Sequence, residues 1–495
     1  MSCRKCGFVP EPQPQNTNSS DSLVSQILRG SRPLLDSDHA MLSAEIVELE
    51  QLQSLYAAQL EKIPLCQCAV LKALENRKSI YAPIRRLPRD ILVEIFHYVC
   101  DSWWTYPSRD SLNVAGPLWV LGHVCGLWRD TLHSSPVSWA QKLVVRGPFT
   151  TYALDILQTY LKHTGEHLLN LHVEFTVPAQ DKEIMSLLVQ SCHRWQNLRI
   201  NTKHHMHHLE SISHFPVLQR IDIHILEPFD SDYHSDVLLG APQLWHACLH
   251  GLGISRIRLP PGVTHFSGSI TCPEDLNLLS QLPKLKRCHL WMRLAAKEAP
   301  VVTVAQLSHL YVMDADILNV LSAPLLSSLT IDHVQKRFQP PSFESPQDSI
   351  TRFLHRSKCH LQSLSVSKAI FASGTPSGLF ALEACSTISC LKLDLPPRMI
   401  NGIVEALTSP SVLPNLHQLI LCISQPSEDK CATILRMARS RRDAGVLKLV
   451  GVQFPEEKNK NMEEDMRALS GGNFEMRFEK WDPPYGDHFY LWNLS

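Results

Sequence analysis

Residues 416–421 read LHQLIL, in which Leu416, Leu419 and Leu421 form the pattern apolar-x-x-apolar-x-apolar. The end of this pattern alternates with a period of two, which predicts a strand with one buried face. The pattern returns ten more times between residues 168 and 449, as LLNLHV, WQNLRI, LQRIDI, ISRIRL, LKRCHL, LSHLYV, LSSLTI, LQSLSV, ISCLKL and AGVLKL. Eleven occurrences argue against a chance run of leucines.

The spacing of these motifs predicts a repeat architecture. Successive motifs start between 19 residues apart (Leu307 to Leu326) and 36 residues apart (Leu218 to Ile254). These steps centre on the period of leucine-rich repeats, roughly 20–29 residues. Helical segments such as LDILQTYLK, EIMSLLVQSC, ADILNVLS and GIVEALT lie between the motifs. A strand-plus-helix unit cannot bury its apolar face alone, so we expect an irregular α/β solenoid with a curved parallel sheet over 150–455.

The ends of a solenoid need covers. At the C-terminal end, Phe474, Met476 and Phe478 alternate in NFEMRFEKW, which predicts a last strand. The aromatic residues of WDPPYGDHFYLWNLS are expected to close the stack, within a C-terminal cap over 456–495.

Composition excludes several classes of protein. The chain has 495 residues, 47 basic and 48 acidic, with a formal net charge of -1. This balance gives no global attraction to nucleic acid or to an anionic membrane. The first residues lack an apolar segment of the signal-peptide type, so we expect a cytoplasmic or nuclear protein whose 15 cysteines are mostly reduced.

The N-terminal third begins with two contrasting segments. Residues 1–35 are rich in Pro, Gln, Asn and Ser and are predicted to be a disordered tail. Over 36–82, apolar residues at steps of three and four predict a helix with Asp38 as N-cap, interrupted at Pro64 and resumed until Pro83. It could form a short coiled coil, an antiparallel hairpin, or a helix that packs back on its own chain.

Residues 87–139 contain two further helical patterns. One follows Pro88 and has a broad apolar face, and the second starts near Pro117 and ends at the SSP of residues 134–136. The first face comprises Ile91, Leu92, Ile95, Phe96, Val99 and Cys100, and the second Leu121, Val124, Cys125, Trp128 and Leu132. Two short helices cannot bury all of this surface on each other, so part of it should meet another segment or another protein.

This segment, LPRDILVEIFHYV followed by VLGHVCGLWRDTLHSSPVSWAQKLVV, resembles the F-box, in the F-box-like form abundant in fungal families. The resemblance implies a three-helix F-box module over 83–145, ahead of a repeat domain that holds a protein substrate. It also implies docking on a Skp-type adaptor, and through it on a cullin-RING ubiquitin ligase. The implied adaptor-binding residues are Leu87, Pro88, Ile91, Leu92, Ile95 and Val124, and the implied core residues are Phe96, Cys125, Trp128 and Trp139.

The segment from Asp101 to Pro117 departs from this pattern, because it is longer than the usual connection between the first two F-box helices. Its Trp103, Trp104 and Tyr106 could lie in a simple loop or form a contact surface. A different interpretation of the whole chain is a leucine-rich-repeat binding scaffold whose two helices only cap the solenoid.

We found no recognisable catalytic motif, so no enzymatic activity, cofactor or metal site is expected. Phosphate-binding, nucleophile-elbow and HExxH motifs are absent from the sequence. The pairs Cys3/Cys6 and Cys66/Cys68 are too isolated for a structural zinc site. The run KHHMHH (His204, His205, His207 and His208) could bind a metal adventitiously but is expected to be a solvated loop, and the basic run MARSRRD (437–443) is too short to predict nucleic-acid binding.

Overall fold

The computed structural model describes residues 18–103, 110–174, 181–202, 207–225, 233–251, 253–292, 300–332, 345–373, 377–424, 428–454 and 469–480. It divides into two compact units, Met1–Arg89 and Asp90–Ser495. The predicted C-terminal aromatic cap, Cys3, Cys6, Trp104 and Tyr106 lie outside the described residues. None of the described helices is both long enough and apolar enough to cross a membrane.

The first unit is helical and corrects three predictions. A helix, α1 (Asn18–Leu28), occupies part of the segment predicted to be disordered. Helix α2 (Asp36–Ile80) continues through Pro64, since a proline removes only one backbone hydrogen bond and a long helix can tolerate the loss. Leu35, not Asp38, is the N-cap, and the Asp38 carboxylate accepts from the Leu35 N–H at 3.3 Å.

Apolar side chains along α2, including Ile46, Leu60 and Val70, are exposed within the first unit. Coiled-coil pairing of this helix therefore stays a prediction. A short 3-10 helix, η1 (Pro83–Arg86), ends the unit.

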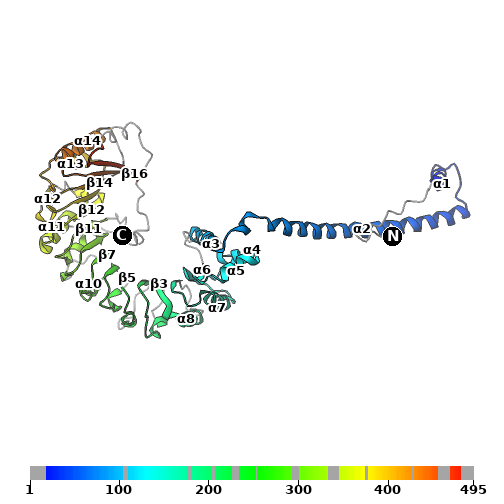
Figure 1. Cartoon of the computed structure of the whole chain (residues 1–495), viewed down its shortest axis with the longest axis horizontal. Helices are drawn as coiled ribbons and strands as arrows, with labels where there is room; N and C mark the ends of the chain where they lie inside the picture. Colours follow the sequence, from blue (N-terminus) through cyan, green and yellow to red (C-terminus); the bar gives the residue numbers. More distant parts are fainter. Residues whose placement is uncertain are drawn as a thin grey trace. The chain divides into compact units, whose positions relative to one another are not determined.

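The second unit is a mixed α/β fold with a solenoid-like arrangement (Figure 1). Within the described residues, fourteen strands form one sheet in chain order, and every neighbouring pair is parallel. The strands are β1 (Leu143–Arg146), β2 (Leu169–Glu174), β3 (Trp195–Thr202), β4 (Arg220–Ile225), β5 (His246–His250), β6 (His265–Ile270), β7 (Arg287–Met292), β9 (His309–Val312), β11 (Ser328–Ile331), β12 (Ser363–Val366), β13 (Cys390–Leu395), β14 (Gln418–Ile423), β15 (Leu449–Phe454) and β16 (Glu475–Lys480). A separate two-stranded parallel sheet consists of β8 (Val302–Thr303) and β10 (Leu321–Ser322), which precede and follow β9 in the sequence.

The sheet is curved, with the described helices packed on its outer face and its inner face turned away from them (Figure 1). The helices of the solenoid are α7 (Ala153–Thr164), α8 (Asp181–Val189), α9 (His207–Glu210), α10 (Pro273–Ser280), α11 (Pro346–Ser357), α12 (Ser377–Phe380), α13 (Ile400–Ala406) and α14 (Glu428–Asp443). Where successive strands are close in the sequence, a 3-10 turn takes the place of a helix, as at η4 (Ile254–Arg256) and η5 (Ala315–Val320). The sequence pattern predicts a helix at η5, where the structure has such a turn. The core lies between the sheet and this outer layer.

Nine of the eleven motifs coincide with strands of the sheet, and their second and third apolar positions are in register. Leu171 pairs with Leu198, which pairs with Ile221, and all three are buried. For the other two motifs, the predicted strand positions were wrong. ISRIRL forms the η4 turn, and AGVLKL is three residues out of register, because β14 aligns Leu419 with Val450.

The strands β5 and β6 were missed by the sequence pattern because small residues replace leucine at their core positions. Ala247 pairs with Phe266, and Leu249 pairs with Gly268. A Cβ on Gly268 would lie 2.7 Å from the Phe266 ring and 3.2 Å from Ile254 Cδ1. Ile254, from the η4 turn, thus fills the core space that a leucine on β6 would have occupied.

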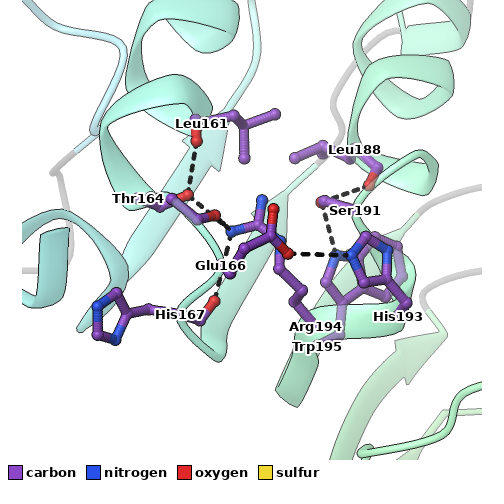
Figure 2. Close-up of polar contacts among 10 residues, drawn as sticks. Leu161, Thr164, Glu166, His167, Leu188, Ser191, His193, Arg194 and Trp195 are labelled. Atoms are coloured by element: carbon purple, nitrogen blue, oxygen red, sulfur yellow. Dashed lines mark hydrogen bonds and ion pairs between the residues drawn. The ribbon is translucent and has the colours of Figure 1, made fainter.

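Arginine side chains join successive repeats, as Figure 2 illustrates. The Arg194 guanidinium donates to Thr164 Oγ1 at 3.1 Å and to the Gly165 carbonyl, both at the end of α7 in the preceding repeat. On the same turn, Ser191 Oγ accepts from Trp195 Nε1 at 3.1 Å and donates to the Leu188 carbonyl at 2.7 Å (Figure 2).

Arg356 and Arg441 repeat this arrangement further along the chain. Arg356 donates to the Leu321 carbonyl at 2.9 Å, and Arg441 donates to the Leu407 carbonyl at 2.7 Å. Each satisfies carbonyl groups where a helix or turn of the preceding repeat ends, which would otherwise be buried without a partner.

Candidate functional site

The apolar residues of helix α3 (Arg89–Trp103) lie in two stripes, one buried and one largely exposed. Leu92, Phe96 and Cys100, four residues apart, are buried. The second stripe, called here the exposed stripe, consists of Ile91, Ile95, Tyr98 and Val99. Ile95 is half-buried, whereas Ile91, Val99 and Tyr98 keep 44%, 38% and 77% of their surface exposed.

The second predicted helix is in fact two helices. Helix α4 (Pro117–Val124) ends before Cys125, whose backbone is extended (φ -162°, ψ 169°), and α5 (Gly126–His133) follows. Leu121 and Leu132 are buried, but the break turns Val124 outward, where 55% of its surface is exposed. A third short helix, α6 (Pro136–Ala140), completes the segment.

Aromatic rings hold these helices together. The Phe96 and Trp128 rings lie 5.0 Å apart, which joins α3 to α5. Trp139 is buried, and its Nε1 donates to the Leu132 carbonyl at 3.0 Å. On the opposite side, Trp139 meets Tyr160 of α7 edge-to-face at 5.1 Å, so the helices also cover the first repeat of the solenoid.

The predicted adaptor-binding residues are not equally accessible. Ile91 and Val124 are exposed and Ile95 is half-buried, but Leu92 is fully buried and belongs to the interior of the helices. Leu87 follows η1 and precedes Pro88 in the first unit. Of the predicted core residues, Phe96 and Trp139 are buried, and Cys125 and Trp128 are half-buried.

The long connection before α4 covers one edge of the sheet. Ser111 N donates to the Val144 carbonyl at 2.8 Å, and Val144 N donates to Ser111 Oγ at 3.0 Å. These bonds occupy backbone groups on the outer side of β1 that a first strand leaves unpaired. The side chain of Trp103, at the end of α3, lies outside the described residues.

The second surface is the face of the sheet turned away from the helices, called here the open face. Alternate residues of each strand reach it, and over β4 to β9 most of them are histidines or aromatic residues. They are His224, His246, His250, His265, His289, Trp291, His309 and Tyr311. Five of these rings are in sequential contact, with His224 against His250 at 4.3 Å, His250 stacked on Trp291 at 4.4 Å, Trp291 against His289 at 4.8 Å and His289 against Tyr311 at 4.0 Å. These residues and the three other histidines are together called the open-face band.

Two half-buried histidines of this band have strongly lowered pKa values. Burial, together with Arg220, lowers the pKa of His246 to about 4. Burial, together with His246, lowers the pKa of His265 to about 4. These two imidazoles therefore add ring surface without charge at neutral pH, beside the charged Arg220 and Arg287 of the same face.

Sequence reasoning missed the open-face band because its members are dispersed over five repeats. A signal was available: histidine or an aromatic residue alternates with the core positions in LWHACL, KRCHLW and LSHLYV. No family model and no curated protein matches this chain, so the exposed stripe and the open face are the observations on which a function rests.

Proposed function

We propose that this protein is a substrate-recognition subunit of an SCF-type (Skp-cullin-F-box) ubiquitin ligase. Its α3–α6 helices act as an F-box-like module that binds a Skp-type adaptor, and its solenoid acts as a leucine-rich-repeat domain that binds a protein substrate. The observation that carries the proposal is the exposed stripe of α3.

The exposed stripe has the properties of a protein-binding surface. Ile91, Ile95 and Val99 follow one another along the helix at four-residue steps, so their side chains are neighbours. Each buried aliphatic side chain contributes about 1.5–3 kcal/mol, and this stripe leaves much of that contribution unrealised. Tyr98, the fourth member of the stripe, adds an exposed aromatic ring, a residue type enriched at binding hot spots.

The open face fits the role of a substrate surface. It is concave and rich in aromatic rings, and the half-buried His246 and His265 are uncharged at neutral pH, which favours a protein segment with apolar and hydrogen-bonding groups. In this role the chain catalyses nothing: it raises the concentration of a substrate near the ligase by tethering. A cytoplasmic or nuclear location belongs to the same proposal.

The test is co-purification of the full-length protein with a Skp-type adaptor and a cullin. Ile91→Asp and Val99→Asp should each weaken adaptor binding by at least about 30-fold, the loss expected for a hot spot of about 2 kcal/mol. Val301→Asp is the matched control, because Val301 lies in the solenoid and is 47% exposed. Adaptor binding unchanged by both α3 variants, or no adaptor binding by the wild type, would refute the proposal.

The second candidate is a non-ligase leucine-rich-repeat scaffold whose helices only cap the solenoid. The contact of Trp139 with Tyr160 favours it, since it covers the first repeat. Both variants should fold under either hypothesis because Ile91 and Val99 are exposed, so adaptor binding distinguishes the two. Recovery of adaptor without cullin would identify an adaptor-binding scaffold that does not direct ubiquitin transfer.

A further inference from the structure

Four side chains of metal-ligand type meet on the open face where β4 and β5 pair. Asp222 and His224 are alternate residues of β4, and Cys248 and His250 are alternate residues of β5. The strand register places Asp222 opposite Cys248 and His224 opposite His250. Paired strands lie about 4.8 Å apart, so four long side chains on one face can converge on a single point.

The distances between the ligand atoms are those of a compact site. Asp222 Oδ1 lies 3.2 Å from His224 Nε2, and Cys248 Sγ lies 2.8 Å from His250 Nε2. Oxygen and nitrogen atoms of Asp222, His224 and His250 all lie within 4.8 Å of one another. Cys248 is not among these three mutually close residues, and the contact of its Sγ within the set is with His250. Tetrahedral zinc, with bonds of about 2.0–2.3 Å, needs ligand atoms roughly 3.3–3.7 Å apart, so the Cys248 side chain must turn from His250 toward Asp222 and His224 to complete the site.

The surroundings match those of a protein metal site. Cys248 and His250 are buried, and Asp222 and His224 keep 24% and 30% of their side-chain surface exposed. Asp222 Oδ1 is a buried oxygen without a satisfactory hydrogen bond, which is the property expected of a ligand atom. The other carboxylate oxygen, Oδ2, lies 3.3 Å from Arg199 Nε, and this contact orients the carboxylate from outside the cluster.

We propose that Asp222, His224, Cys248 and His250 bind one zinc ion. One thiolate, two imidazoles and one carboxylate make a complete tetrahedral set of the types that zinc prefers. The two negative charges of the thiolate and the carboxylate neutralise the charge of Zn²⁺, so the loaded site has no net charge of its own.

Binding of the metal must release one proton. A cysteine that ligates zinc is a thiolate, so Cys248 must lose its thiol proton. When zinc binds, the Zn–S bond replaces the S–H bond, and the proton passes to solvent. The ion then joins two adjacent repeats in the middle of the open face, whether or not the helices bind an adaptor.

The test uses the full-length protein in a background where Cys3, Cys6, Cys66 and Cys68 are serine, to remove the closely spaced cysteine pairs of the sequence. After chelator treatment, Co²⁺ is added as a spectroscopic probe, and Zn²⁺ then displaces it. We expect one cobalt ion per chain with thiolate-to-cobalt charge-transfer absorption and the visible bands of tetrahedral cobalt. Cys248→Ser should abolish the charge-transfer band, and His250→Gln should weaken zinc binding by at least about 100-fold, more than the usual loss for an outer-shell residue.

Two control variants show whether the cobalt spectrum arises at this site. Cys422→Ser removes another buried cysteine on the open face, which bonds to Gln453, and should leave the cobalt spectrum unchanged. Replacing His204, His205, His207 and His208 by glutamine should also leave it unchanged, because that run contains no thiol. If Cys248→Ser fails to fold, His224→Gln, at a partly exposed position, should weaken binding to a similar degree as His250→Gln. Absence of a charge-transfer band in the parent protein, or its persistence in folded Cys248→Ser, would overturn the assignment.

Discussion

The indole of Trp139 and the phenol ring of Tyr160 meet edge-to-face with their centroids 5.1 Å apart. One ring belongs to α6, the last of the short N-terminal helices of the unit, and the other to α7, the first helix of the solenoid. Since Trp139 is also bonded to the Leu132 carbonyl, this contact makes the helices and the first repeat one packed structure.

Trp139→Ala should therefore destabilise both parts together. Removal of a buried tryptophan costs about 3–5 kcal/mol, and here the cavity would open between α6 and α7. We expect a lower midpoint of urea denaturation and faster amide hydrogen exchange in α7 as well as in α5. Tyr98→Ala, which removes an aromatic ring that is 77% exposed, should leave both measurements unchanged. Slow exchange in α7 of the Trp139 variant would show that the contact is not stabilising.

The buried guanidinium of Arg441 should contribute more to the free energy of unfolding than any exposed arginine of α14. It donates to the carbonyls of Leu407, Val412 and Leu413 of the preceding repeat. Arg441→Met keeps most of the apolar stem but leaves these carbonyls unsatisfied, so we expect a loss of about 2–4 kcal/mol in the free energy of unfolding. Arg436→Met removes an exposed ion pair with Glu405 and should change stability by less than about 0.5 kcal/mol. Equal effects of the two variants in chemical denaturation would contradict this.

Gly251 should not tolerate any side chain. Its φ is +120°, and a Cβ at this position would lie 1.9 Å from the Ile225 carbonyl oxygen. The turn is further fixed by Ser269 Oγ, which accepts from Gly251 N at 2.9 Å. We expect Gly251→Ala to lower the free energy of unfolding by more than about 2 kcal/mol. Gly262→Ala, where the nearest atom would be 3.7 Å away, is the matched control and should fold with near wild-type stability in thermal unfolding.

Stability should fall on acidification between about pH 6.5 and pH 4. Burial, with the charge of Arg199, lowers the pKa of His172 to about 4, and burial, with His246, does the same for His265. In this window the unfolded chain binds protons that the folded chain rejects, so the stability present above pH 6.5 is progressively lost as the pH falls. One pKa unit on a fully shielded group corresponds to about 1.4 kcal/mol, and partial exposure reduces this value. Midpoints of thermal unfolding should show a weaker pH dependence in a His172→Gln/His265→Gln variant; an identical dependence would rule out this origin.

Several features of the chain follow from the sequence because they depend on local periodicity. In LSSLTI and LHQLIL, a leucine is followed by two further apolar residues at alternate positions, a pattern that predicts a strand with one buried face. Nine motifs of this kind coincide with strands of the sheet. The burial of Phe474 and Met476 at β16 follows from the same alternation.

Tertiary structure decided what periodicity cannot distinguish. The sequence shows a single broad apolar face on α3, but packing against Trp128 buries Phe96 and leaves Ile91 exposed. Gly268 does not match the leucine pattern, and only the packing of Ile254 beside it shows how the core is filled. Asp222 and Cys248 come together only because neighbouring repeats stack in one particular register, which depends on the lengths and conformations of the intervening turns and not on any short motif. The sequence by itself thus determines the repeating strand, whereas the exposed stripe depends on how α3 packs on α5, and the cluster of Asp222, His224, Cys248 and His250 depends on how the repeats stack.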